Sequence, residues 1–434
     1  MKAAAGGIRA AVGSWAARRF MARVAKKGLN LSRLPEYALV AVRRDGMDPV
    51  PGLGKVRERE PVRKLPLPFS SGVWMITGYE AARQVLGDGA AFSNEFSKVT
   101  SGTGVSAEKT PGGLGMVDPP IHTRRRKLLT PEFTMRRLAR LTPLIHDIVQ
   151  GCLDEMERKA AAGEPVDLVE DFALPIPSLV ICELLGVPYA DRAEFQKFSA
   201  SRFDIENGTN ASFGAISTSL EYLHGIIKQQ RKEPGDGLLG ALITEHGDDL
   251  DDEELAGLAD GLLTGGFETT ASMLALGTLL LMRDPEYASR LRDDEGGEFA
   301  ERFVEEALRY LTVVQVAFPR IAKDDIVING QEIHKGDIVV VSLSGADRDA
   351  SLSPDGSDMD VFDPDRVAAA SHLAFGHGMH RCIGAELAKM ELRAAYPMLV
   401  RRFPRLRVAG DPEKLEFRRL SIVYGLKSLP VKVD

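Results

Sequence analysis

The sequence predicts a mainly α-helical fold with small β-sheets, an α+β protein in which helices dominate. Three observations support this prediction. Helical hydrophobic patterns are long and numerous, and strand-like runs are short and gather in a small β-rich part near each end. From about residue 46 onward, no low-complexity linker or internal repeat divides the chain.

The elements of the first half follow from hydrophobic periodicity. Residues 73–77 are typical of a short buried strand, and a helix begins at Gly78 and ends near Leu86. Residues 93–118 lack periodicity and predict a long binding loop or lid. A strongly basic helix follows Pro120. Longer helices are predicted over 142–163, 166–186, 189–203, 213–231, 251–283 and 298–311.

The second half ends in short strands around one further helix. Asn329-Gly330 predicts a hairpin turn. A helix is predicted over 383–402. The predicted strands are 326–328, 332–334, 337–343, 405–408, 414–418 and 421–424.

Composition limits the class of protein. The chain has 434 residues, of which 44% are hydrophobic and 27% charged, so disordered and fibrous classes are excluded. A net charge of −7 disfavours a nucleic-acid binder. The sparse cysteines (Cys152, Cys182, Cys382) exclude a disulfide scaffold and indicate a reducing, cytoplasmic location. No apolar run approaches the length of a transmembrane helix.

The N-terminus differs from the rest in charge. Residues 1–35 contain eight Lys or Arg and neither Asp nor Glu. We therefore treat 1–45 as a basic N-terminal extension and 46–434 as one large domain. The extension is a solvated arm or a docked helix. The alternative is an amphipathic helix in contact with an anionic membrane surface, as in a peripheral membrane protein.

The most informative segment is 375–384, Phe-Gly-His-Gly-Met-His-Arg-Cys-Ile-Gly. Its alternating glycines allow a tight loop. Cys382 begins a helix, where backbone N–H groups favour the thiolate, a good ligand for iron. His380 can reach an anionic group beside the metal. The alternatives are a buried apolar cysteine, or a zinc site with His377, although no second Cys/His pair with zinc spacing exists.

This segment resembles the haem-binding signature of the cytochromes P450 at every fixed position, from Phe375 to Gly384. The resemblance covers about residues 46–430. It implies the P450 fold, one large domain with a helix-rich and a β-rich lobe. It also implies heme b (iron protoporphyrin IX) as cofactor, with Cys382 as axial ligand and Phe375 packed near the sulfur.

A second motif of the family lies ahead of this segment. Glu306 and Arg309 match its E-x-x-R, and i, i+3 residues share a helix face. Within 362–366, Arg366 matches the arginine that completes a buried structural network in the family. The role that the resemblance implies for these three residues is structural.

The long apolar helix contains Gly-Gly-Phe-Glu-Thr-Thr at 265–270. Glycine inside a helix is unfavourable, so Gly265 suggests a ligand pressed against the backbone. The run resembles the distal helix of the family, which loosens locally. Glu268 and Thr269 match its acid–alcohol pair, which relays protons to iron-bound oxygen.

Haem propionates require cations. The matches to the family's propionate ligands are His122, Arg126, Arg320 and His380. Neighbouring side chains are expected to face outward and form a basic docking surface for an acidic electron donor, namely Arg124, Arg125 and Lys127.

The resemblance also places residues around a substrate. The expected pocket residues are Leu263, Thr264, Val313 and Val316, which are mostly apolar. They favour a fatty acid, a terpenoid or a polyketide-like substrate. One departure from the family is Asp347, where its members often have Asn.

These observations predict a monooxygenase that inserts one atom of dioxygen into a C–H bond of a hydrophobic small molecule. Electrons are expected from a ferredoxin- or flavodoxin-type donor and its NAD(P)H reductase. The alternatives are a peroxide-dependent or coupling P450, and a haem-binding or sensing protein without turnover.

Overall fold

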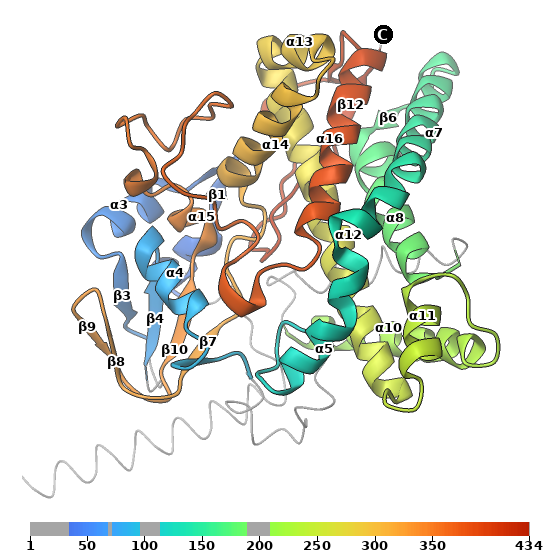
Figure 1. Cartoon of the computed structure of the whole chain (residues 1–434). Helices are drawn as coiled ribbons and strands as arrows, with labels where there is room; N and C mark the ends of the chain where they lie inside the picture. The colour runs from blue at the N-terminus through green and yellow to red at the C-terminus, as the bar shows by residue number, and fades with distance from the viewer. Residues whose placement is uncertain (1–33, 68–71, 96–112, 189–208, 434) are drawn as a thin grey trace, which may run out of the picture.

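The computed structural model describes residues 34–67, 72–95, 113–188 and 209–433 (Figure 1). Three sequence-based predictions lie outside these residues in whole or in part. They are the basic arm up to residue 33, most of the long loop 93–118, and the helix 189–203.

Helices make up most of the described chain, as predicted. The α-helices are α2 (Glu36–Leu39), α3 (Pro51–Arg59), α4 (Tyr79–Gly87), α5 (Ile121–Leu129), α6 (Met135–Leu138), α7 (Thr142–Ala161), α8 (Pro175–Leu185), α10 (Thr209–Gln230), α11 (Leu238–His246), α12 (Asp252–Arg283), α13 (Pro285–Asp293), α14 (Glu298–Leu311), α15 (Leu343–Ala346) and α16 (Ala385–Arg402). Figure 1 shows α7, α8, α12 and α16 side by side in the helix-rich part.

The central helix α12 shows how the sequence sets its bounds. The Asp251 side chain caps its first turn by accepting the Glu254 N–H at 2.7 Å, and acidic residues fill that turn. Arg283 lies in the last turn, where a cation is favourable. Most of its side chains are buried against α8, α10 and α16, so packing supplies most of its stability.

The strands form four small sheets. They are β1 (Arg44–Asp45), β2 (Asp48–Pro49), β3 (Val62–Leu65), β4 (Val73–Ile76), β5 (Phe92–Ser93), β6 (Val166–Asp167), β7 (Arg320–Ala322), β8 (Ile326–Ile328), β9 (Gln331–Ile333), β10 (Ile338–Val341), β11 (Arg407–Val408) and β12 (Pro430–Lys432). The largest sheet has the order β3-β4-β10-β7-β5, and only its β4–β10 pair is parallel. Its apolar side chains form a core separate from that of the helices, which gives the β-rich lobe.

One predicted helix is interrupted. Residues 166–186 form strand β6, a π-helix (Val169–Ala173) and then α8. Val166 pairs with β12, and the Asp171 carboxylate accepts the Asp167 N–H at 3.0 Å. A strand partner distant in the sequence therefore overrides the local helical pattern.

Other elements differ from the prediction, both near the end of the chain and earlier in it. The predicted strands 414–418 and 421–424 contribute only isolated bridges, from Phe417 to Leu426 and from Val423 to Val314. Helices α3, α11 and α13 were not predicted, although Asp284 caps α13 and Pro285 occupies its first position.

Residues 34–45, predicted as part of the extension, pack with the body of the protein. Val40, Ala41 and Val42 are buried. The Arg44 guanidinium donates to the Leu311 carbonyl at 2.6 Å and to the Gln315 side chain at 2.9 Å. These contacts join the segment to the end of α14.

One described helix, α12, is long and apolar enough to cross a membrane by length and composition alone. However, 78% of its most apolar window is buried inside the protein. This is the pattern of a core helix.

Candidate active site

The segment 375–384 is a tight loop between the β-rich lobe and α16. Gly376 and Gly378 have φ of 70° and 72°, as the alternating glycines predicted. A Cβ at Gly378 would lie 2.6 Å from the Leu86 carbonyl oxygen, so this position also requires a close approach to α4. The Cys382 N–H closes the loop by donating to the Phe375 carbonyl at 2.8 Å.

Cys382 lies just ahead of α16. Burial by the surrounding protein raises the pKa of its thiol, while the Gly384 N–H and the charges of Arg381 and Arg126 act in the opposite direction. The local amide therefore favours the thiolate, as the sequence predicted, but burial outweighs it in the chain alone. A cationic ligand on the sulfur would reverse this balance.

The middle of α12 presents a small open region. Gly265 is exposed in the middle of α12, and a Cβ built on it meets no atom within 4 Å. The half-buried Thr269 hydroxyl donates to the Gly265 carbonyl at 2.7 Å. The helix continues without interruption from Asp252 to Arg283, so the local loosening expected from the resemblance is not seen.

Glu268 does not share the environment of its neighbour. Its carboxylate is fully buried and forms an ion pair with Arg418. The Arg418 N–H donates to the Gly425 carbonyl at 2.8 Å in the C-terminal hairpin, and Gly425 lies directly against Ser272 of α12. The structure therefore places the predicted acid against this hairpin and the predicted alcohol toward the open region.

Four of the predicted cofactor ligands, two arginines and two histidines, gather in one cluster. The His122 and His380 rings lie 4.2 Å apart. The buried Arg320 guanidinium donates to the Phe318 carbonyl at 2.6 Å, and that of Arg126 donates to a loop carbonyl at 2.7 Å. Burial, followed by the charges of His122 and Arg320, lowers the pKa of His380 to about 3.

This cluster fits an anionic group that the described residues do not supply. Among the described residues, no carboxylate forms an ion pair with Arg126 or Arg320. The buried His122 Nε2 and His380 Nδ1 atoms also lack a hydrogen-bond partner within the described ranges. Buried donors and cations are normally satisfied. The two carboxylates of a haem would satisfy them, so the residues present fit this cofactor.

The other basic side chains of α5 do not all face outward. Lys127 is exposed, but Arg125 is buried, and its Nε lies 3.1 Å from a Glu254 carboxylate oxygen. Arg124 binds the same carboxylate at 2.5 Å. The expectation that Arg125 faces outward was therefore wrong, because the acidic first turn of α12 neutralises both arginines.

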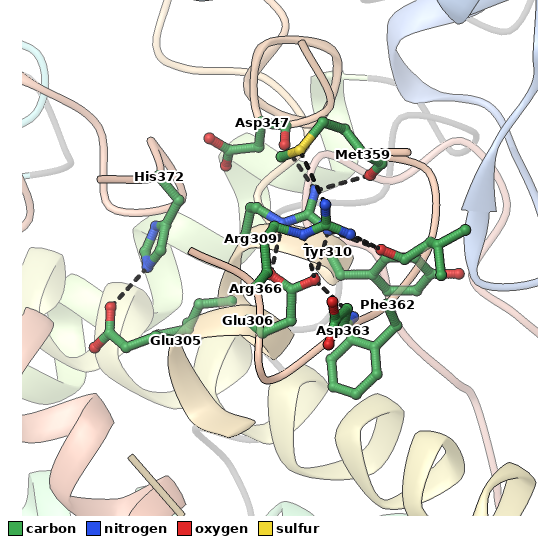
Figure 2. Close-up of polar contacts among 12 residues, drawn as sticks. Glu305, Glu306, Arg309, Tyr310, Asp347, Met359, Phe362, Asp363, Arg366 and His372 are labelled. Atoms are coloured by element: carbon green, nitrogen blue, oxygen red, sulfur yellow. Dashed lines mark hydrogen bonds and ion pairs between the residues drawn. The ribbon is translucent and has the colours of Figure 1, made fainter. Parts of the chain in front are cut away.

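Glu306, Arg309 and Arg366 lie together in a buried network (Figure 2). The Arg309 guanidinium binds both Glu306 oxygens at 2.7 Å. It also donates to the carbonyls of Asp347 and Met359, each at 2.9 Å. Arg366 lies 3.5 Å from Glu306 and ties the loop of residues 357–361 to it.

Two polar residues near this network, Glu305 and His372, were missed in the sequence, and the contacts of Asp347 were not foreseen. Asp347 accepts the Leu373 N–H at 2.5 Å, and His372 lies 3.3 Å from a Glu305 oxygen. Each lies beside a recognised motif, since Glu305 precedes Glu306 and His372 precedes Phe375. The sequence shows that Glu305 and His372 lie next to these motifs, but it does not show that the two side chains contact each other.

The predicted pocket residues occupy different environments. Leu263 and Val313 are buried in the helical core, whereas Thr264 and Val316 are half-buried. Val316 pairs with Ser342 across an isolated bridge and packs beside Leu39 and Val42. The contact of these residues with a substrate stays a prediction.

Comparisons with known proteins agree with this arrangement. The family model described as Cytochrome P450 matches residues 68–237 and 221–433. Cytochrome P450 165B3 of Amycolatopsis orientalis is 42% identical over 363 residues, or 82% of this chain and 89% of that protein. Vitamin D3 dihydroxylase of Streptomyces griseolus is 39% identical, with 86% and 90% covered. The structure of OxyC, a cytochrome P450 implicated in an oxidative C–C coupling reaction during vancomycin biosynthesis, matches with a TM-score of 0.78 and 38% identity over 90% of this chain and 95% of OxyC.

Proposed function

The chain belongs to the cytochrome P450 family, and on this premise we propose that it inserts one oxygen atom into a C–H bond of a hydrophobic small molecule. It is a P450 monooxygenase, and its cofactor is haem. The observation that carries the proposal is the Cys382 loop beside the cluster of His122, Arg126, Arg320 and His380, whose arginines have no carboxylate ion-pair partner among the described residues.

Each residue of the site has a proposed part in this chemistry. Bound haem supplies the iron that activates dioxygen, and thiolate ligation favours O–O cleavage. Cys382 provides the thiolate, on a loop fixed by its own N–H bond to Phe375. The propionates are held by His122, Arg126, Arg320 and His380.

Proton delivery is assigned to α12. The Thr269 hydroxyl lies toward the open region beside Gly265 and can pass a proton there. Glu268 directly precedes Thr269 in the chain. Once its carboxylate leaves Arg418, it can take up a proton from water and pass that proton on. Gly265 leaves room for dioxygen and water, because it carries no side chain.

The substrate is proposed to be a hydrophobic secondary metabolite. The expected pocket residues are mostly apolar, which favours binding of a hydrophobic ring system or chain. One relative is named vitamin D3 dihydroxylase. The electron donor is a ferredoxin or flavodoxin with its NAD(P)H reductase.

A second candidate is oxidative coupling, which the similarity to OxyC favours. Coupling removes two hydrogen atoms from the substrate and forms one bond, and dioxygen is reduced to two water molecules with two electrons from the donor. Turnover under ¹⁸O₂ separates the candidates. Hydroxylation places one labelled atom in the product, whereas coupling leaves the product unlabelled.

Two substitutions test the roles of individual residues. Thr269→Ala should uncouple electron consumption from product formation, measured as NAD(P)H consumed per product formed. Unchanged coupling would remove Thr269 from the proton path. Cys382→Ala should abolish the red-shifted Soret band of the reduced, carbon-monoxide-bound protein, and persistence of that band would exclude Cys382 as the ligand.

A further inference from the structure

Side-chain acceptors hold the backbone that leads into the Cys382 loop. The Leu373 N–H donates to the Asp347 carboxylate at 2.5 Å. The next amide, that of Ala374, donates to His372 Nδ1 at 3.2 Å. This acceptor role leaves Nε2 as the protonated nitrogen of a neutral His372 ring. Side-chain acceptors therefore hold the N–H groups of two consecutive residues, Leu373 and Ala374, in fixed directions.

Glu305 fixes the His372 ring and also reaches the helix after the loop. Its Oε2 lies 3.3 Å from His372 Nε2, a contact drawn in Figure 2. Its Oε1 lies 2.7 Å from Lys389 Nζ on α16. One carboxylate of α14 therefore contacts the chain both before and after Cys382.

Both partners of Glu305 also meet Phe375. The His372 ring lies 5.9 Å from the Phe375 ring, and Lys389 Nζ lies 5.9 Å from the centre of the same ring. The Phe375 carbonyl accepts the Cys382 N–H. Displacement of His372 or Lys389 would therefore be transmitted to the residue that closes the loop.

The electrostatics keep Glu305 in this role. Burial disfavours its charge, but hydrogen bonds from His372 and Lys389 outweigh burial and bring its pKa down to about 2. Arg393 of α16 adds a second cation at 3.7 Å. The carboxylate is thus ionised throughout the neutral pH range and keeps its partners.

We propose that Glu305 and His372 are a positioning pair that holds the backbone before Phe375 in the path required for Cys382 to remain the haem ligand. This inference rests on the proposed role of Cys382. The pair is separate from the Glu306–Arg309 network, because Glu305 binds its partners with its own carboxylate.

The test uses the full-length haem protein and four variants. Glu305→Gln removes the negative charge of the Glu305 side chain. His372→Phe keeps a ring but removes both nitrogens, whereas His372→Asn keeps an acceptor near the Nδ1 position. Glu301→Gln is the matched control, because Glu301 lies on the same helix and pairs with Arg393 but not with His372 or Lys389.

The first readout is the rate at which the reduced, carbon-monoxide-bound form loses its red-shifted Soret band. Glu305→Gln and His372→Phe should raise this rate about tenfold, the factor expected when one hydrogen bond to a charged group is lost. His372→Asn should restore part of the wild-type rate, and Glu301→Gln should leave the rate unchanged. Wild-type rates in Glu305→Gln and His372→Phe, or an equal rise in Glu301→Gln, would overturn the proposal.

The second readout is hydrogen exchange of the Leu373 and Ala374 amides in the haem-free chain. The proposal requires the Ala374 amide to exchange about tenfold faster in His372→Phe than in wild type. If the wild-type protein lacks the red-shifted band, the proposed role of Cys382 is refuted. Hydrogen exchange of the Leu373 and Ala374 amides would still decide whether Glu305 and His372 hold the backbone. A normal wild-type band with unchanged variants would refute the positioning pair alone.

Discussion

The chain contains two Glu-x-x-Arg pairs of nearly identical geometry, and we predict that substitution of their arginines has very different costs. Arg309 binds both Glu306 oxygens at 2.7 Å, and Arg158 binds both Glu155 oxygens at 2.8 Å. The first pair has side-chain exposures of 4% and 7%, and the second has 54% and 46%. Only burial and the surrounding partners differ.

The magnitudes follow from these environments. Arg309→Met leaves the buried Glu306 carboxylate with the Asp363 N–H at 2.9 Å and with Arg366 at 3.5 Å. Removal of one member of a buried ion pair costs about 3–5 kcal/mol. The two abandoned carbonyls that Arg309 binds at 2.9 Å add to this cost. Arg158→Met should change the free energy of unfolding very little, because an exposed i, i+3 pair is well solvated.

The assay is urea unfolding of both variants and wild type, followed by far-UV circular dichroism. Arg309→Met should lower the unfolding midpoint strongly with an unchanged slope, whereas Arg158→Met should stay close to wild type. Arg309→Lys should be intermediate, because it keeps the charge but not the two parallel hydrogen bonds. If Arg309→Met and Arg158→Met differ by less than about 1 kcal/mol, the assignment of the network as a structural support is wrong.

Two further predictions concern contacts that the sequence did not reveal. Burial raises the pKa of Asp347 from 3.8 to about 6, although hydrogen bonds from the Leu373 N–H and the Thr312 hydroxyl act in the opposite direction. The folded state thus holds this proton more tightly than the unfolded state, and stability is lost as pH rises from about 4 to about 6. Urea titrations between about pH 4 and about pH 7 should show wild type losing about 2–3 kcal/mol relative to Asp347→Asn, with a constant difference at higher pH. Parallel curves would contradict the shift. Gly425→Ala would place its Cβ 2.5 Å from Ser272 Oγ, so it should destabilise the protein by about 1–3 kcal/mol, and Ser272→Ala should recover part of this loss; strictly additive effects in the double variant would show that the two residues do not press on each other.

Local patterns predicted much of the fold because their physical basis is local. The helix over 298–311 was predicted with the bounds of α14, and the helix 251–283 differs from α12 by one residue. Both have strong periodic or capping signals that depend only on near neighbours. The predicted helix 166–186 failed at its start because Val166 pairs with Val431, a contact that local periodicity does not encode.

In the candidate site too, features set by residues close in sequence were predicted, and contacts between distant segments were not. The Cys382 loop was recognisable because its glycines, histidine and cysteine lie within ten residues, and Gly376 and Gly378 adopt the conformation that their spacing requires. The outward orientation of Arg125 was wrong, because its partner Glu254 belongs to another helix.

The sequence by itself determined the family, the ligand loop and most helices, since each is specified by residues close together in the chain. Only the tertiary structure decided which charged side chains are buried and which partner each of them meets. Glu306-x-x-Arg309 and Glu155-x-x-Arg158 read alike in sequence, yet one is buried and one is exposed. Glu268 meets Arg418, and Glu305 meets His372, across long separations in the chain. Burial and electrostatic pairing depend on which segments pack together, and packing is a property of the whole fold.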